Sequence, residues 1–234
     1  MGFFRSRKPK ADDRWTSGAF AESSGAIGET SLTVAVRSRP LLPDERRRGD
    51  KPRDIVRVLD DKHVVVLDPD FDEKNYLDER THRTKERRYT FDKAFGAKAT
   101  NRDVYQKTAR ALISGVLNGQ NGTVFAYGST GSGKTYSLMH VGSKPASSDR
   151  GLVTRAAEEI FARARAEGPN VETRLAVGFV QIYNEEVYDL LVDETERPGG
   201  TTTPLRLVDR AGAAHCEGAS ARVARSADDV LALL

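Results

Sequence analysis

Apolar and polar residues alternate in several short stretches of the N-terminal half, and this alternation predicts strands. In "SLTVAVRSRP", residues 31–40, apolar residues alternate with smaller or polar ones until Pro40 stops the strand. Two β-branched runs separated by charged residues predict a hairpin within residues 54–68, and "RRYTFDKAF", residues 87–95, returns to strand character. The charged and irregular residues 69–88 predict a surface loop.

A helical period begins further along the chain, in residues 100–119. Thr100 is a suitable N-cap for this helix, and the pair Asn118-Gly119 is a suitable end. The inner face of the helix is predicted to consist of Val104, Thr108, Leu112, Ile113 and Val116. A second pattern of the same kind predicts a helix over residues 152–166.

Two further segments complete the pattern of elements. "TVFAY", residues 123–127, is a continuous apolar run, which is typical of a central strand covered on both faces. A long strand is predicted over residues 171–183, and Asn184 is placed to cap a short helix, "EEVYDLL". Because strands alternate with helices along the chain, we predict an α/β fold with a central, mostly parallel sheet.

Residues 1–30 mix charged residues with Ser, Gly and Ala and have no period, so we expect a disordered basic and polar arm before a folded domain at residues 31–234. Lys and Arg total 37 against 34 acidic residues, and the basic runs are short and lie beside acidic residues. This balance argues against a dedicated nucleic-acid-binding protein. No apolar run approaches the ~20 residues of a membrane-spanning helix, so we expect no membrane partner. A single cysteine, Cys216, cannot form an internal disulfide and fits the cytoplasm.

The strongest chemical signal is a glycine-rich loop directly after "TVFAY". It satisfies the pattern Gly-x-x-x-x-Gly-Lys-[Ser/Thr] with Gly128, Ser129, Thr130, Gly131, Ser132, Gly133, Lys134 and Thr135. Glycines permit backbone angles at which successive N–H groups face an anion, and a following helix adds N–H groups without internal partners. Lys134 would bring positive charge to the β- and γ-phosphates, and the Thr135 hydroxyl is an oxygen ligand suited to Mg²⁺. The alternative is a flexible Gly/Ser linker, which the flanking strand and helix patterns disfavour.

Several separated motifs occur in the order and approximate spacing of the kinesin motor domain. They are "VRSRP", "FDKAF", "DVY", "NGTVFAYGSTGSGKTY" and "QIYNEEVYDLL". From about residue 32 onward the chain therefore resembles this family, and "VVVLDP" at residues 64–69 is more similar to the kinesin-eight class than to conventional kinesin. The resemblance implies a P-loop NTPase three-layer sandwich, ATP and Mg²⁺ as cofactors, microtubules as partner and a place on the cytoskeleton.

The resemblance also implies an adenine pocket. In kinesins the "VRxRP" motif lies by the base, so Arg37, Arg39 and Pro40 would line the pocket, and Tyr136 would pack on the base. A planar base gains from aromatic stacking and from an arginine face, which makes this assignment physically reasonable. Without the family, Arg37 and Arg39 would be interpreted as solvent-facing residues of a strand.

Two motifs with which kinesins sense the γ-phosphate and position the attacking water are missing. The chain contains neither Asn-x-x-Ser-Ser-Arg-Ser-His nor Asp-Leu-Ala-Gly-Ser-Glu. "LRLVDRAG", residues 205–212, imitates the second motif, but Ala213-Ala214 follow where Ser-Glu is expected, so we predict a hairpin turn. The neighbouring His215-Cys216 lacks further ligands at metal-binding spacing and is predicted to be part of an ordinary strand.

Ser226 and Asp229 form a capping box for a helix that the sequence cuts short. We therefore expect the N-terminal part of a kinesin motor domain, with a sheet incomplete at its C-terminal side, no catalytic residue of its own and little ATP turnover. Two alternatives stay open at this point. One is a different P-loop NTPase, and the other is a non-catalytic ATP-binding interaction module.

Overall fold

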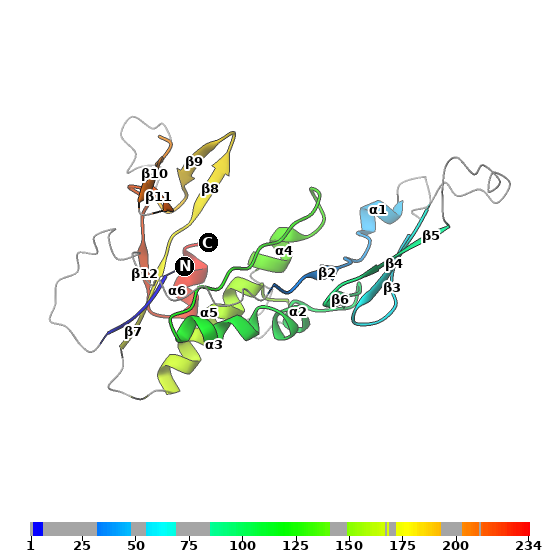
Figure 1. Cartoon of the computed structure of the whole chain (residues 1–234), viewed down its shortest axis with the longest axis horizontal. Coiled ribbons are helices and arrows are strands. Elements are labelled where there is room, and N and C mark those ends of the chain that lie inside the picture. The colour runs from blue at the N-terminus through cyan, green and yellow to red at the C-terminus, as the bar shows by residue number, and fades with distance from the viewer. Residues whose placement is uncertain are drawn as a thin grey trace. The chain divides into compact units, whose positions relative to one another are not determined.

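The computed structural model describes residues 2–6, 32–47, 55–68, 85–140, 149–166, 168, 172–192, 203–210 and 212–234. The chain divides into two compact units (Figure 1). One unit consists of Ala26–Ala111 and Val124–Leu152, and it contains the glycine-rich loop. The other consists of Met1–Gly25, Leu112–Thr123 and Val153–Leu234.

The unit with the glycine-rich loop has two small sheets and several short helices. The parallel pair consists of β2 (Ala35–Arg37) and β6 (Lys93–Phe95). The antiparallel sheet has the order β3-β4-β5, with the strands β3 (Val56–Val58), β4 (His63–Leu67) and β5 (Glu86–Thr90). The helices are α1 (Pro43–Arg47), α2 (Asn101–Lys107) and α4 (Lys134–Met139), and α3 (Arg110–Leu117) crosses the boundary between the units.

The predicted hairpin of residues 54–68 is confirmed, and its turn explains why it forms. The carboxylate of Asp60 accepts hydrogen bonds from the backbone N–H groups of Lys62 and His63, both at 2.8 Å, and also contacts the ring of His63. The hydrogen bond with the ring, followed by the two backbone bonds, lowers the pKa of Asp60 to about 2. A short side chain that satisfies the backbone of a tight turn fixes the register of β3 against β4.

The helix predicted over residues 100–119 is divided into α2 and α3. Thr100 caps α2 as predicted, because its hydroxyl accepts from the N–H of Asp103 while the Asp103 carboxylate accepts from the N–H of Thr100. At the end of α2 the hydroxyl of Thr108 donates to the carbonyl of Val104. Such a bond competes with the backbone ladder of the helix, and α3 begins two residues later.

The other unit is built on a three-stranded antiparallel sheet with the order β1-β7-β12. The strands are β1 (Gly2–Ser6), β7 (Glu172–Val177) and β12 (Arg222–Ala224). Two helices accompany the sheet, α5 (Leu152–Ala166) and α6 (Ala227–Ala232). The predicted bounds of α5 and the predicted capping box of α6 are both confirmed.

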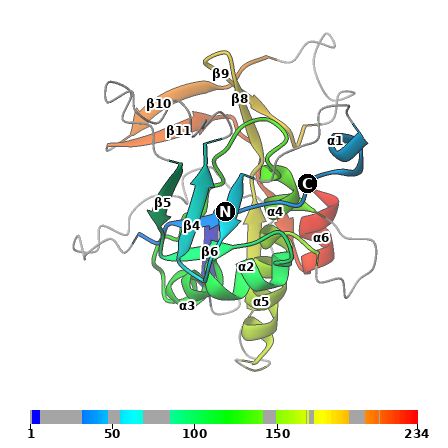
Figure 2. The same cartoon turned by 90° about the vertical axis from the view of Figure 1, so that its right-hand side faces the viewer.

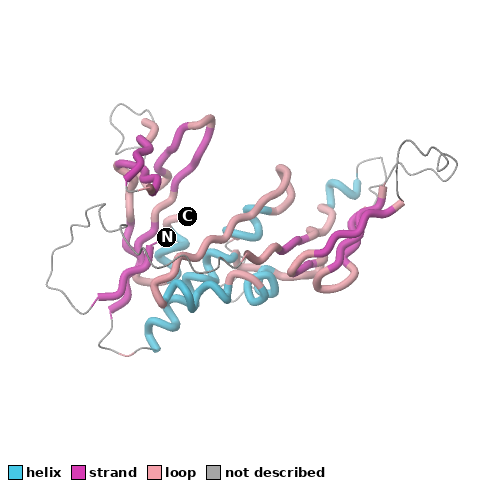
Figure 3. The backbone as a smooth tube through the Cα atoms, in the orientation of Figure 1, coloured by secondary structure: helices cyan, strands magenta, loops and turns pink. Residues whose placement is uncertain are grey.

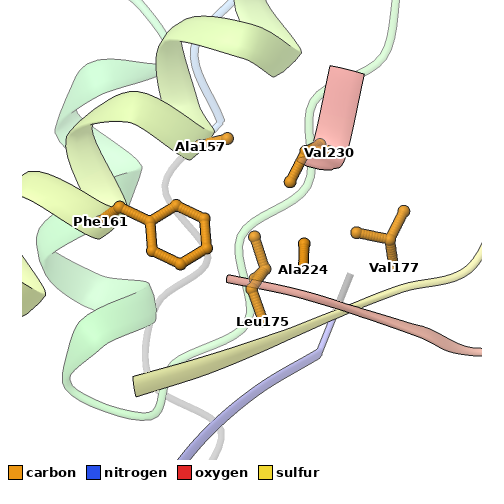
Figure 4. Close-up of a cluster of buried hydrophobic side chains, with 6 residues drawn as sticks. All are labelled: Ala157, Phe161, Leu175, Val177, Ala224 and Val230. Atoms are coloured by element: carbon orange, nitrogen blue, oxygen red, sulfur yellow. The ribbon is translucent and has the colours of Figure 1, made fainter. Parts of the chain in front are cut away.

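The core of this unit lies between its two helices and two of its strands. Its six buried side chains point toward one another in Figure 4 and are Ala157, Phe161, Leu175, Val177, Ala224 and Val230. They come from α5, β7, β12 and α6, which are separated widely in the sequence. Burial of apolar area from four elements is the main force that holds this unit together.

Two hairpins extend the unit (Figure 2). One pairs β8 (Val180–Tyr183) with β9 (Glu186–Asp189), and the other pairs β10 (Arg206–Arg210) with β11 (Ala213–Glu217). The second hairpin confirms the turn predicted in "LRLVDRAG" and places His215 and Cys216 in a strand, as expected. The long strand predicted over residues 171–183 is interrupted at Gly178–Phe179 and therefore forms β7 and β8.

The helix predicted for "EEVYDLL" is wrong, because β9 occupies most of this segment. Asn184 and Glu185 both have positive φ, at 50° and 64°, which is the geometry of a two-residue hairpin turn matched to the twist of its strands. Val187 and Asp189 are buried and Tyr188 is more exposed, so the period is two. Asn184 therefore makes a turn and does not cap a helix.

This turn predicts the effect of a substitution. Glu185→Gly should raise the free energy of unfolding by about 0.5–1 kcal/mol, because a side chain at positive φ carries strain that glycine lacks. Denaturant unfolding measures the change. Gln181→Gly, within strand β8, is the control and should lower stability. A loss of stability in both variants would contradict the assigned turn.

The strand predicted for "TVFAY" is also wrong. Residues 121–128 form no strand with any described segment, and Figure 3 draws the chain before α4 as loop. Val124, Phe125 and Tyr127 are 46%, 76% and 96% exposed. An apolar run records a preference for burial, but a strand also needs a neighbouring backbone with which its N–H and C=O groups can pair. The described strands provide no such neighbour.

Two further predicted segments differ from the structure at one end. Residues 86–88, expected in a surface loop, belong to β5, whose partner β4 supplies the ladder. Residues 2–6, expected in a disordered arm, form β1 against β7, and the adjacent phenylalanines in "GFFRS" suit a strand. The remainder of that predicted arm, residues 7–30, lies outside the described residues, as do residues 69–84 of the predicted loop.

Candidate nucleotide-binding site

The glycine-rich loop joins the irregular segment 121–127 to α4, which begins at Lys134 as predicted. Gly131 and Gly133 have φ of 79° and 96°, values that strain any residue with a Cβ. At Gly128 a Cβ would lie 2.5 Å from the Oγ of Ser132, so the Ser132 side chain would have to move. The loop therefore turns tightly at Gly131 and Gly133, where only glycine avoids backbone strain.

Lys134 reaches back over the loop. Its Nζ donates to the carbonyl oxygens of Gly128 and Ser129, each at 2.8 Å. The N–H of Ser132 donates to the same Ser129 carbonyl at 3.1 Å. The single ammonium group is thus held at the loop, where the motif requires a positive charge for phosphate. Thr135 follows in the first turn of α4 and is exposed.

Arg39 connects the "VRSRP" segment to this loop. Its Nε donates to the carbonyl of Gly131 at 2.8 Å, and its guanidinium binds the Glu45 carboxylate at 2.6 and 2.7 Å. The hydrogen bonds with Glu45 raise the pKa of Arg39. Glu45 also accepts from the N–H of Leu42 at 2.8 Å, which ties the start of α1 to the same pair. Pro40, the next predicted pocket residue, is exposed.

Arg37 is held more deeply than a solvent-facing strand residue would be. Its guanidinium donates to the hydroxyl of Ser137 and the carbonyl of Ala99, each at 2.9 Å, and to the side-chain oxygen of Asn101. Burial lowers its pKa. The alternative interpretation of Arg37 as an ordinary exposed residue is therefore wrong, because its donors are directed into the protein.

The ring of Tyr136 completes the group of predicted residues. The guanidinium carbon of Arg37 lies 5.4 Å from the centre of the ring, and the ring of His140 lies 4.6 Å away with a tilt of 33°. Burial, together with Asp149, raises the pKa of the Tyr136 hydroxyl. Tyr136 is nevertheless 40% exposed, which leaves aromatic surface for a ligand.

These residues fit a magnesium-bound nucleoside triphosphate. The loop provides glycines with positive φ, the Lys134 ammonium and the Thr135 hydroxyl, and Arg39 contacts the same loop from the predicted base side. Among the described residues, no three His, Cys, Asp or Glu side chains gather as a metal site. A cation bound together with the phosphates could take the Thr135 hydroxyl as a ligand. The loop and Arg39 belong to recognisable sequence motifs, whereas Glu45 and Asn101 belong to none and could not be predicted as part of the site.

Comparison with known proteins agrees with this chemistry. A model of the kinesin motor domain family matches residues 37–234. Kinesin-like protein KIN-8B of Arabidopsis thaliana is 49% identical over 162 residues, which cover 69% of this chain and 18% of that protein. Kinesin-like protein KIF19 of Mus musculus is 37% identical over 170 residues, which cover 73% of this chain and 16% of that protein. The chain belongs to the kinesin motor domain family.

The fold class is confirmed by a solved structure of a fast kinesin. It matches with a TM-score of 0.68 and 26% identity over 86% of this chain and 51% of that chain. The α/β fold is thus that of the kinesin P-loop NTPases, and the predicted similarity to kinesin-eight proteins is also confirmed. The chain spans less than a fifth of the length of KIN-8B or KIF19. No described helix has the length and apolar character needed to cross a membrane.

Proposed function

We propose that the chain is the ATP- and Mg²⁺-binding part of a kinesin microtubule motor that acts in the cytoplasm on the cytoskeleton. The observation that carries the proposal is the loop of residues 128–135, with the Lys134 ammonium held against its carbonyls. The family match supports it and disfavours a different class of P-loop NTPase. In the complete motor, ATP binding and hydrolysis would alter the microtubule-binding surface.

Each site residue has a role in this proposal. The backbone of residues 128–133 would surround the phosphates, Lys134 would neutralise the β- and γ-phosphates, and Thr135 would hold Mg²⁺. When bound, Mg²⁺ supplies charge compensation between the phosphates. Tyr136 would stack on the adenine, with Arg39 and Pro40 along the pocket. Arg37 would contribute through the Tyr136 ring that it faces.

We further propose that this 234-residue chain binds ATP but scarcely hydrolyses it. Hydrolysis requires groups that position the attacking water, and neither kinesin switch motif occurs in the sequence. ATP titration against a GTP competitor, followed by hydrolysis assays with and without microtubules, tests both parts. We expect ATP binding with negligible turnover. Robust microtubule-stimulated hydrolysis would overturn the second part, and absence of ATP binding would overturn the first.

The same purified chain can distinguish the proposed motor function from a role as a non-catalytic, ATP-responsive interaction module. Co-sedimentation with microtubules, with and without ATP, reports whether this chain itself contacts tubulin. If the chain is part of a motor, its binding to microtubules is expected to depend on the nucleotide. Unchanged association in all nucleotide conditions would favour the interaction module.

The Arg39–Glu45 pair gives a specific prediction for the site. Glu45→Gln should weaken ATP binding about threefold, because the neutral amide leaves Arg39, which contacts the Gly131 carbonyl, without its paired charge. Isothermal titration measures the change. Asp44→Asn, on the same helix, is the matched control and should have no effect. Equal losses in both variants would mean that net charge alone is responsible.

A further inference from the structure

Asn101 is a fully buried polar residue at the start of α2, with an exposed fraction of 0%. Its Nδ2 donates to the backbone carbonyl of Tyr136 at 3.0 Å and to that of Asp149. Its Oδ1 accepts from the guanidinium of Arg37. One amide thus connects β2, α2, α4 and the segment at residue 149, all within the same unit.

The oxygen and the nitrogen of the Asn101 side chain are both hydrogen-bonded, so loss of this side chain should cost free energy. A buried group that loses its hydrogen-bond partner keeps the full penalty of its desolvation. With an apolar residue at position 101, the Tyr136 carbonyl, the Asp149 carbonyl and the Arg37 guanidinium would each lose one hydrogen bond. Networks of this kind restrict a site to one arrangement when every member is satisfied.

The two residues that Asn101 connects face each other at the predicted base side of the site. Arg37 is fixed by Asn101, Ser137 and Ala99, and its guanidinium lies 5.4 Å from the Tyr136 ring centre. Tyr136 is held at its backbone carbonyl by Asn101. Asn101 is therefore bonded both to the backbone of Tyr136 and to the guanidinium of Arg37.

The phosphate side of the site is held by other contacts. Lys134 binds the carbonyls of Gly128 and Ser129, and Arg39 binds that of Gly131. Asn101 takes part in none of these bonds. Loss of the Asn101 side chain should consequently disturb the position of Tyr136 more than the binding of phosphate.

We propose that Asn101 is a positioning residue of the nucleotide site, which holds Tyr136 and Arg37 in place as a platform for the nucleotide base. This inference rests on the proposed function, because it concerns the same nucleotide. The sequence did not reveal it, since an asparagine at the first turn of a helix carries no functional pattern.

A double-mutant cycle on the 234-residue chain tests the proposal. Mg²⁺·ATP affinity is measured by titration for Asn101→Leu, Tyr136→Leu and the double variant. Asn101→Leu alone should weaken binding about tenfold, which corresponds to the loss of one well-placed contact, and should add at most about twofold in the Tyr136→Leu background. A full tenfold loss in both backgrounds, or no loss in either, would overturn the proposal.

Controls separate positioning from stability and from the proposed function. Val64→Ala removes a buried side chain from β4 in the same unit and should lower stability without changing ATP affinity. If Asn101→Leu does not fold, Asn101→Asp, which has the same size but no amide donor, takes its place in the cycle with the same expected coupling. Lys134→Ala is measured in parallel. Retained ATP affinity in that variant would refute the proposed function, whereas additive effects at residues 101 and 136 would refute only the role of Asn101.

Discussion

Replacing Lys134 with alanine is expected to weaken Mg²⁺·ATP binding by at least about a hundredfold. The Lys134 ammonium is held at the loop by the carbonyls of Gly128 and Ser129, both at 2.8 Å. Loss of a charge-assisted contact with phosphate costs roughly 3 kcal/mol, which corresponds to a factor of this size. Titration calorimetry at fixed ionic strength measures the affinity.

Two variants make this result specific to the loop. Lys107→Ala removes an equal charge from the last turn of α2 and should leave ATP affinity unchanged. Lys134→Arg keeps the charge but replaces a compact ammonium with a planar fork, so we expect it to restore only part of the affinity. An alanine variant that binds ATP as tightly as the unmodified chain would mean that the loop does not hold the phosphates.

Leu175→Ala is expected to lower the free energy of unfolding by about 2–5 kcal/mol. Leu175 has an exposed fraction of 0% and lies at the centre of the six-residue core shown in Figure 4. Its truncation removes the transfer free energy of the side chain and leaves a cavity between α5, α6 and the sheet. Chemical denaturation followed by circular dichroism reports the loss.

Leu207→Ala is the matched control for this core variant. Leu207 is 55% exposed on β10, so the same chemical change should alter stability by less than about 0.5 kcal/mol. Similar losses in the two variants would show that the cluster around Leu175 is not the main core of this unit.

Features determined by neighbouring residues could be predicted from the sequence. The caps at Thr100 and Ser226 depend on side chains three residues away, and both are confirmed. The start of α4 at Lys134 follows from the glycine that precedes it. The same locality made the phosphate-binding motif recognisable, because its residues are consecutive.

Features that depend on distant partners could not be predicted in the same way. Residues 123–127 have the composition of a buried strand, but pairing requires another backbone that their own sequence does not specify. The segment after Asn184 has an apolar pattern that suits either a helix or a strand. It forms a strand because the positive φ angles of Asn184 and Glu185 make a tight turn that returns the chain alongside β8. Asn101 contacts groups 35, 48 and 64 residues away, so no local pattern marks it.

The predicted adenine pocket combines information from a family motif with information from local geometry. The resemblance placed Arg37 and Arg39 together beside the base. The structure distinguishes them, because Arg39 binds Glu45 and the phosphate loop, whereas Arg37 is directed toward Asn101 and Ser137. In the proposed function, Arg39 would therefore contact the nucleotide, and Arg37 would support Tyr136.

The most direct measurement is amide NMR of the chain during titration with ATP and Mg²⁺. Backbone N–H signals of residues 128–135 should shift strongly and saturate together as the triphosphate enters the loop, and a smaller response should reach Tyr136. Signals of the loop that stay unchanged while ATP binds elsewhere, or while no binding occurs, would contradict the assignment of these backbone amides as the phosphate site.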